Sequence, residues 1–296
     1  ERMSRTREND LYLPGFTLAD NLAFTADLAD AVEGCDLLLL VPPSQVMREV
    51  LRQAAPHIAA GTLVVSASKG IENETLKTMS EVLEEVLPPG KAEQPVFLSG
   101  PSFAREVASG MPTAVVAASR GDEAARRVQE VFSTRNFRVY TNDDVIGVEL
   151  GGALKNVIAL AAGVSDGLGF GYNTRAALIT RGLAEISRMG LALGANPATF
   201  SGLAGMGDLV LTCTGDLSRN RTVGMELGRG KSLQEILAGM KMVAEGVKTT
   251  LSAYQLAKKL EVEVPITEQM YRILYEEKDP RQAVTDLMMR ELKAEV

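Results

Sequence analysis

A single lysine lies in the middle of a long apolar stretch and carries the clearest chemical potential in this sequence. Lys155 falls within residues 147–169, which contain no proline and predict a helix with apolar side chains on nearly every side. Such a helix is buried, and desolvation lowers the pKa of an enclosed amine toward the range useful for proton transfer. The alternative is a lysine whose stem is buried while its ammonium reaches water. The stretch by itself leaves both interpretations open.

The helix face that carries Lys155 is built from small residues. Gly151 and Gly152 lie one turn before the lysine, and Ala159 and Ala162 follow it at helical spacing. We therefore expect a small ligand to lie on this strip, next to the amine.

Two other polar residues follow apolar or glycine-rich segments. Lys69 comes directly after the apolar run 62–67, where an ammonium at the end of a buried strand is able to meet an anionic substrate or cofactor. Asp208 ends a glycine-flanked turn and is able to accept a hydrogen bond from a lysine or a substrate hydroxyl. An exposed loop lysine and an ordinary turn aspartate are the alternatives.

Residues 218–221, with the sequence SRNR, stand where a helix is predicted to begin. A hydroxyl, guanidinium groups, an amide and the N–H groups of a helix start together form a receptor for phosphate or carboxylate. A solvated basic helix start is the alternative. The segment SGPSFA at 99–104 similarly places Gly100 and Ser102 before a short helix, but Ser102 has no nucleophile elbow and no plausible histidine partner.

The composition excludes several classes of function. The chain has 296 residues, 46% of them hydrophobic, and a formal net charge of -7, which argues against a general binder of nucleic acids or membrane surfaces. Cys35 and Cys213 lie far apart and are expected to be reduced thiols. With His57 as the only histidine we expect no metal site. No signal peptide or membrane span is apparent, so we expect a soluble protein without membrane insertion.

The elements that must position these residues change type along the chain. Short apolar runs predict strands at 37–41, 62–67, 96–99, 113–118 and 137–140, with helices at about 44–55, 72–87 and 122–132, a pattern typical of βαβ units in a mainly parallel sheet. After residue 144 the pattern is helical only, with helices expected at 175–193, 220–227, 233–237, 247–260, 266–275 and 281–294. We therefore expect an α/β domain at 1–146 and an all-α domain at 147–296.

Several long motifs resemble one known family. They are residues 147–185, SKG at 68–70, SGPSFA at 99–104, GLAGMGDLVLTCT at 202–214, SRNR at 218–221 and VAEGVKT at 243–249. Together they are similar to the bacterial NAD(P)-dependent glycerol-3-phosphate dehydrogenases of the soluble type. The resemblance covers essentially the whole chain from about residue 11 onward.

The resemblance implies a reaction and a set of site residues. It implies reduction of dihydroxyacetone phosphate to sn-glycerol 3-phosphate for glycerophospholipid synthesis, with NADP or NAD as cofactor and NADPH favoured, in a cytoplasmic homodimer. It also implies a Rossmann-like first domain that binds the dinucleotide and a helical second domain for substrate and dimerisation. The implied residues are Lys155 as the catalytic acid/base; Lys69, Gly100, Ser102, Lys155, Asp208, Ser218, Arg219 and Asn220 as substrate contacts; and Lys69, Ala104, Arg219, Val243 and Glu245 as cofactor contacts.

One departure from the family pattern concerns the start of the sequence. The family opens with a strand and a glycine-rich turn that holds the cofactor pyrophosphate, and Gly15 is not that turn. We expect a βα unit and the strand after it, together roughly 30 to 45 residues, to precede Glu1 in the natural protein. Two other functions remain open: a related β-hydroxyacid dehydrogenase with a carboxylate substrate, and a non-catalytic protein that keeps the helical domain for dimerisation or metabolite sensing.

Overall fold

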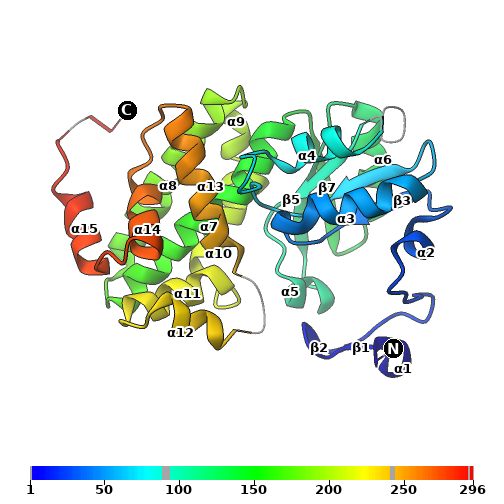
Figure 1. Ribbon diagram of the computed structural model, residues 1–296, viewed down its shortest axis with the longest axis horizontal. Helices are drawn as coiled ribbons and strands as arrows, with labels where there is room; N and C mark the ends of the chain where they lie inside the picture. The colour runs from blue at the N-terminus through cyan, green and yellow to red at the C-terminus, as the bar shows by residue number, and fades with distance from the viewer. Residues whose placement is uncertain (1, 89–93, 241–243, 293, 296) are drawn as a thin grey trace. The chain divides into compact units, whose positions relative to one another are not determined.

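The computed structural model describes residues 2–88, 94–240, 244–292 and 294–295 (Figure 1). Contacts within the chain divide it into two compact units. The first unit comprises residues 1–68 and 79–145, and the second comprises residues 69–78 and 146–296. Each unit is described below by itself.

The first unit contains a five-stranded sheet with the order β3-β4-β5-β6-β7. Strands β3, β4 and β5 are parallel to one another, β6 is antiparallel to β5, and β7 is parallel to β6. The carboxyl ends of the first three strands therefore share one edge, which is where α/β sheets bind ligands. The strands are β3 (Leu37–Leu40), β4 (Leu63–Ser66), β5 (Val96–Ser99), β6 (Thr113–Ala118) and β7 (Phe137–Asn142).

Branched apolar side chains explain why these segments are strands. Val65, Val96, Val115 and Val139 come from four neighbouring strands and form a buried core with Val128 of the helix that follows β6. A separate two-stranded antiparallel sheet lies near the start of the chain. The remaining elements of this unit are α1 (Arg2–Thr6), β1 (Glu8–Asn9), β2 (Leu13–Thr17), α2 (Leu28–Val32), η1 (Ser44–Val46), α3 (Met47–Ala54), η2 (Ala55–His57), α4 (Met79–Val86), α5 (Ala104–Ala108) and α6 (Asp122–Phe132).

Within the part of the second unit that the structure describes, the regular elements are all helices, as the sequence pattern after residue 144 predicts. Two helices are shorter than the sequence predicts. In the first unit α4 begins at Met79 and not at residue 72, and in the second unit α15 ends at Met288 and not at residue 294. The helices are α7 (Val145–Gly167), α8 (Tyr172–Ala192), α9 (Pro197–Phe200), the π-helical turn η3 (Leu203–Gly207), α10 (Asp208–Thr214), α11 (Arg219–Gly228), α12 (Leu233–Ala238), α13 (Glu245–Lys259), α14 (Pro265–Tyr275) and α15 (Pro280–Met288).

Helix α7 is the core of this unit. It is long and apolar enough to cross a membrane, but 94% of its most apolar window is buried by the protein, so it is a core helix. The helix ends where Gly169 adopts a φ of +83°, a conformation that favours glycine, and the N–H of Phe170 donates to the carbonyl of Ser165. Lys155 and Asn156 lie near the middle of α7 and are both buried.

Glycines bring α7 and α11 unusually close together. A Cβ atom added to Gly163 would lie 2.0 Å from the carbonyl oxygen of Arg221, and one added to Gly224 would lie 2.0 Å from that of Leu160. Backbone therefore packs directly on backbone along this contact. The start of α11 is fixed against the helix that carries Lys155.

Residues 69–78 belong to the helical unit, although the sequence pattern places them in the first domain and partly in a helix. Ile71 is fully buried in the helical core, and the Ser252 hydroxyl of α13 donates to its carbonyl at 3.2 Å. Leu76 has a φ of +59°, which does not fit a continuous helix. Burial of Ile71 thus outweighs the local helical pattern, and Lys69 is carried into the helical unit.

Candidate active site

Asp208 lies between Lys155 and Lys69, which both belong to the helical unit. The Lys155 ammonium donates to Oδ1 of Asp208, and the Lys69 ammonium donates to Oδ2 at 2.7 Å. Asp208 is 1% exposed, whereas the side chains of Lys155 and Lys69 are 10% and 20% exposed. One buried carboxylate therefore holds two ammonium groups, and the cluster has a net positive charge when all three groups are ionised.

The turn before α10 places Asp208 against α7. A Cβ atom added to Gly151 would lie 2.6 Å from the carbonyl oxygen of Ala204, and one added to Gly205 would lie 2.2 Å from that of Phe200. Glycine at both positions lets this backbone sit on α7 one turn before Lys155. The expectation that a ligand lies on the strip at Gly151 is wrong, because protein backbone fills that space.

Burial and charge set the ionisation of the cluster. Burial and the nearby charge of Lys69 lower the pKa of Lys155 to about 8, while Asp208 opposes this shift. Burial also disfavours ionisation of Asp208, but the two ammonium groups outweigh it and keep the pKa of the Asp208 carboxyl below its ordinary value. Near neutral pH the carboxylate is charged and Lys155 is able to give up a proton.

A chain of amides connects three helices beside Lys155. The Asn220 amide donates to Oδ1 of Asn156 at 2.9 Å, and Oδ1 of Asn220 accepts the N–H of Gly246 at 3.0 Å. Ser218 caps α11 by accepting the N–H of Arg221 at 3.3 Å. The structure thus joins Asn220 of the predicted receptor to Asn156, a residue that sequence reasoning did not single out. Its signal was a second polar residue next to Lys155 in an apolar helix.

The two arginines of the SRNR segment have different surroundings. Arg219 is exposed, whereas the Arg221 side chain is 12% exposed and forms ion pairs with Asp166 and Asp216. The sequence pattern groups both arginines in an anion receptor. In the structure Arg221 pairs with the carboxylates of Asp166 and Asp216, whereas Arg219 is an exposed cation at the start of α11.

The other predicted site residues lie at the end of β5 and the start of α13. Gly100 has a φ of +133°, and a Cβ atom there would lie 3.0 Å from Cα of Val115, so this position requires glycine. The Ser102 hydroxyl donates to the carbonyl of Gly100 at 3.1 Å, and Ala104 is the exposed first residue of α5. Glu245 begins α13. Val243 lies outside the described residues.

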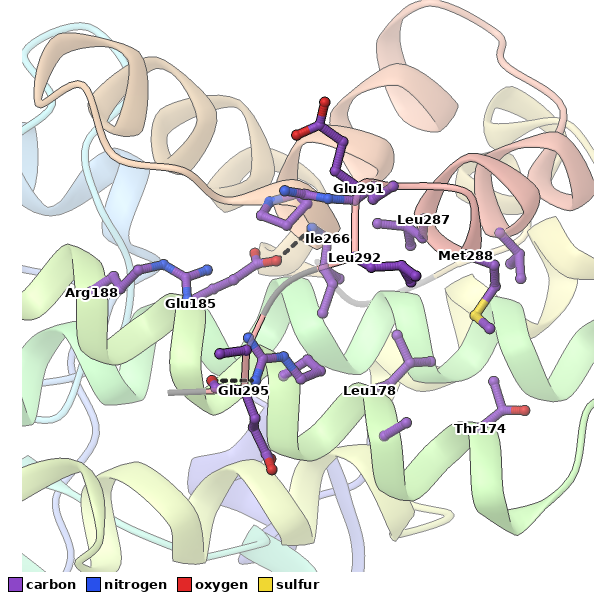
Figure 2. Close-up of a pocket in the computed structure, with 16 residues that line it drawn as sticks. Thr174, Leu178, Glu185, Arg188, Ile266, Leu287, Met288, Glu291, Leu292 and Glu295 are labelled. Carbon is purple, nitrogen blue, oxygen red and sulfur yellow. Dashed lines mark hydrogen bonds between the residues drawn. The ribbon is translucent and has the colours of Figure 1, made fainter.

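A second buried ionisable group lies in a cavity of about 470 Å³ lined by α8, α14, α15 and the residues that follow α15 (Figure 2). Glu185 points toward the start of α14, where it accepts the N–H of Ile266 at 2.6 Å and the N–H of Thr267 at 3.1 Å. The rest of the lining is mostly apolar, with Leu178, Leu287 and others around it. Glu185 caps a helix, and no lysine contacts it among the described residues.

Comparison with known proteins gives one consistent result. Two sequence-family models match the chain. The family model for the NAD-dependent glycerol-3-phosphate dehydrogenase N-terminus matches residues 1–125, and the family model for the C-terminus matches residues 144–285. A glycerol-3-phosphate dehydrogenase [NAD(P)+] of Syntrophotalea carbinolica is 66% identical over 100% of this chain and 89% of its own length. The relative from Citrifermentans bemidjiense is 64% identical over 99% of this chain and 88% of its own.

Solved structures agree with this result. The crystal structure of glycerol-3-phosphate dehydrogenase from Coxiella burnetii has a TM-score of 0.94 and 42% identity, over 98% of this chain and 88% of its own. A ketopantoate reductase from Ralstonia eutropha shares only the fold, at 17% identity and a TM-score of 0.53. The predicted family and the predicted fold class, a Rossmann-like domain followed by a helical domain, are both confirmed. The chain belongs to the NAD-dependent glycerol-3-phosphate dehydrogenase family.

Proposed function

We propose that this protein interconverts dihydroxyacetone phosphate and sn-glycerol 3-phosphate by hydride transfer with NAD(P)H. The observation that carries the proposal is the Lys155–Asp208–Lys69 cluster, in a chain whose relatives are named for this reaction. Reduction of the ketone adds a hydride to the carbonyl carbon and a proton to its oxygen, so the site needs a proton donor next to that oxygen.

Lys155 is the proton donor in this proposal. Its pKa of about 8 leaves it mostly protonated at pH 7, yet close enough to neutrality to release the proton as the alkoxide forms. In the direction of oxidation the neutral amine accepts the proton of the C2 hydroxyl. Asp208 fixes the ammonium of Lys155, and Lys69 supplies a second positive charge that stabilises developing negative charge on oxygen.

The phosphate group is bound at the start of α11 in this proposal. Arg219 supplies a planar guanidinium that suits phosphate oxygens, and the buried Ser218 and Asn220 flank it. Gly100 and Ser102 complete the substrate contacts from the end of β5.

The residues at the carboxyl edge of the sheet fit a dinucleotide. Ser66 and Ser99 end the adjacent strands β4 and β5, and their buried hydroxyls have no hydrogen-bond partner among the described residues. Polar groups in such a position are suited to a ligand that lies across the strand ends. Lys69, Ala104, Arg219, Val243 and Glu245 would hold the cofactor, with NADPH favoured over NADH. When bound, the nicotinamide supplies or accepts the hydride.

These assignments give the two domains different roles. We assign dinucleotide binding to residues 1–146, and substrate binding and dimerisation to residues 147–296. The proposal also includes a cytoplasmic homodimer that supplies glycerophospholipid synthesis.

A substrate panel tests the reaction. The purified protein is mixed with NADPH or NADH and with dihydroxyacetone phosphate, dihydroxyacetone or a β-keto acid, and nicotinamide absorbance is followed. We expect rapid oxidation with dihydroxyacetone phosphate. Preference for the keto acid would instead support the related β-hydroxyacid dehydrogenase, and inactivity on all three with unchanged cofactor would support a non-catalytic protein.

Arg219→Gln tests the phosphate receptor. We expect kcat/KM for dihydroxyacetone phosphate to fall by about 10- to 100-fold, because charge-assisted bonds to a dianion are lost. Activity toward dihydroxyacetone should stay near the wild-type value when NADPH is saturating, so that the assigned cofactor contact of Arg219 does not limit the rate. An equal loss on both substrates would contradict a role in binding phosphate. Arg229→Gln, at the exposed end of the same helix, is the matched control.

A further inference from the structure

We infer that Arg221 is a positioning residue that holds the turn before α11, so that Ser218, Arg219 and Asn220 are correctly placed to bind phosphate. The inference rests on the proposed function and deepens it. It assigns a task to a cluster of buried charges that the proposed chemistry does not use.

Arg221 connects the turn before α11 to helix α7. Its Nε donates to Oδ2 of Asp166 on α7 at 2.8 Å, and its Nη1 donates to Oδ1 of Asp216 in the turn at 3.0 Å. Its backbone N–H donates to the Ser218 hydroxyl. A planar guanidinium is able to make such divergent bonds in one fixed geometry, which a lysine ammonium does not reproduce.

Asp166 is a rigid anchor for this arrangement. Its side chain is 7% exposed, and its other oxygen accepts two bonds from Arg175 of α8, at 3.1 Å from Nε and 2.5 Å from Nη2. Arg175 and Arg221 thus share one carboxylate from opposite sides. Among the described contacts, only Arg221 continues from Asp166 to Asp216, so Arg175 offers a matched control.

The helix itself is held by other contacts. The close backbone packing at Gly163 and Gly224 seats α11 on α7 without any side chain from Arg221. Removal of the guanidinium therefore leaves the helix in place but breaks the side-chain link from the exposed Asp216 in the turn at residues 215–218 to Asp166 on α7. The residues that follow this turn are those assigned to the phosphate.

Arg221→Gln and Arg221→Lys test the inference in the full chain, with dihydroxyacetone phosphate and dihydroxyacetone as substrates. We expect kcat/KM for the phosphorylated ketone to fall by about 10- to 100-fold in both variants, mostly through KM, because small misplacements of binding groups have effects of this size. With NADPH saturating, so that the cofactor contact assigned to Arg219 does not limit the rate, activity toward dihydroxyacetone should remain within about twofold. Arg175→Gln should keep the wild-type ratio between the two substrates.

Asp216→Asn provides a test that does not disturb the buried cluster. Its side chain is 97% exposed, so folding should be unaffected, and we expect KM for the phosphorylated ketone to rise by about two- to fivefold. An unchanged KM in this variant, an equal loss on both substrates in Arg221→Gln, or an equal effect of Arg175→Gln would overturn the positioning role. A wild-type protein inactive on dihydroxyacetone phosphate would instead overturn the proposed function.

Discussion

Asp208 and Glu185 are both buried carboxylates of the helical unit, yet their pKa values are shifted in opposite directions. Asp208 is 1% exposed and faces two ammonium groups. Glu185 is 2% exposed and accepts hydrogen bonds from the N–H groups of Ile266 and Thr267 and from the Thr267 hydroxyl. The partners, rather than the depth of burial, distinguish the two sites.

The outcome shows how strongly two bonded ammonium groups favour the charged form of a buried carboxylate. Burial raises the pKa of Glu185 to about 7 despite its three donors and the charge of Arg188, whereas the two lysines keep the pKa of Asp208 below its ordinary value. Burial, together with the charge of Lys69, lowers the pKa of Lys155 to about 8 although Asp208 opposes the shift. A group adjusted in this way is suited to proton transfer, whereas Glu185 is suited to capping a helix.

The largest expected effect is on turnover when Lys155 is replaced. Lys155→Ala should lower kcat by about 100- to 10,000-fold, because the developing alkoxide loses both its proton donor and a nearby charge. Steady-state kinetics with dihydroxyacetone phosphate measure the change. Lys278→Ala, a paired lysine elsewhere in the helical unit, is the control and should keep its activity. Normal turnover in Lys155→Ala would show that Lys155 is not the proton donor. The functional contrast between the Lys155–Asp208 cluster and Glu185 would then be wrong.

The next effect concerns stability at Glu185. Its folded pKa is raised, so its contribution to stability is full below about pH 4.5 and is lost as the pH rises through about 7. The shift corresponds to roughly 3 kcal/mol of unfolding free energy. Glu185→Gln cannot ionise, so its stability should not show this loss.

Urea unfolding of wild type and Glu185→Gln at pH 5 and pH 8 measures the difference. The free energy of unfolding of the variant, relative to that of the wild type, should be higher at pH 8 than at pH 5. We expect this change even though glutamine accepts fewer backbone N–H bonds. A difference that is the same at both pH values would show that Glu185 stays ionised and that its hydrogen bonds, with the charge of Arg188, suffice to charge a buried carboxylate.

The smallest effect is a shift in pH dependence at Lys69. The positive charge of Lys69 helps to lower the pKa of Lys155, so Lys69→Met should raise that pKa. Ketone reduction requires the protonated amine and should decline as the pH rises through about 8 in the wild type. In the variant we expect the midpoint to move upward by up to about one pH unit.

The pH profile of kcat in the direction of reduction gives this midpoint whatever the absolute rate. Lys77→Met, on the same segment 69–78, is the control and should keep the wild-type midpoint. A downward shift in Lys69→Met would mean that Lys69 acts on Lys155 mainly through Asp208 and not through its own charge.

Local patterns predicted most of the elements, because a buried strand or helix is recognisable from nearby residues alone. The runs at 96–99, 113–118 and 122–132 match β5, β6 and α6 to the residue. Residues 69–78 were predicted less well, because the burial of Ile71 among helices remote in sequence decides their conformation.

The sequence by itself determined the family, the order of the elements and the identity of Lys155 as the residue to test. Only the tertiary structure placed Asp208 against lysines 53 and 139 residues away, and only it showed that backbone covers Gly151. It also separated Arg219 from Arg221, which look equivalent in the SRNR motif. The reason is physical: spacing along the chain fixes the face on which a side chain lies, whereas its partners and its ionisation depend on what folds against that face.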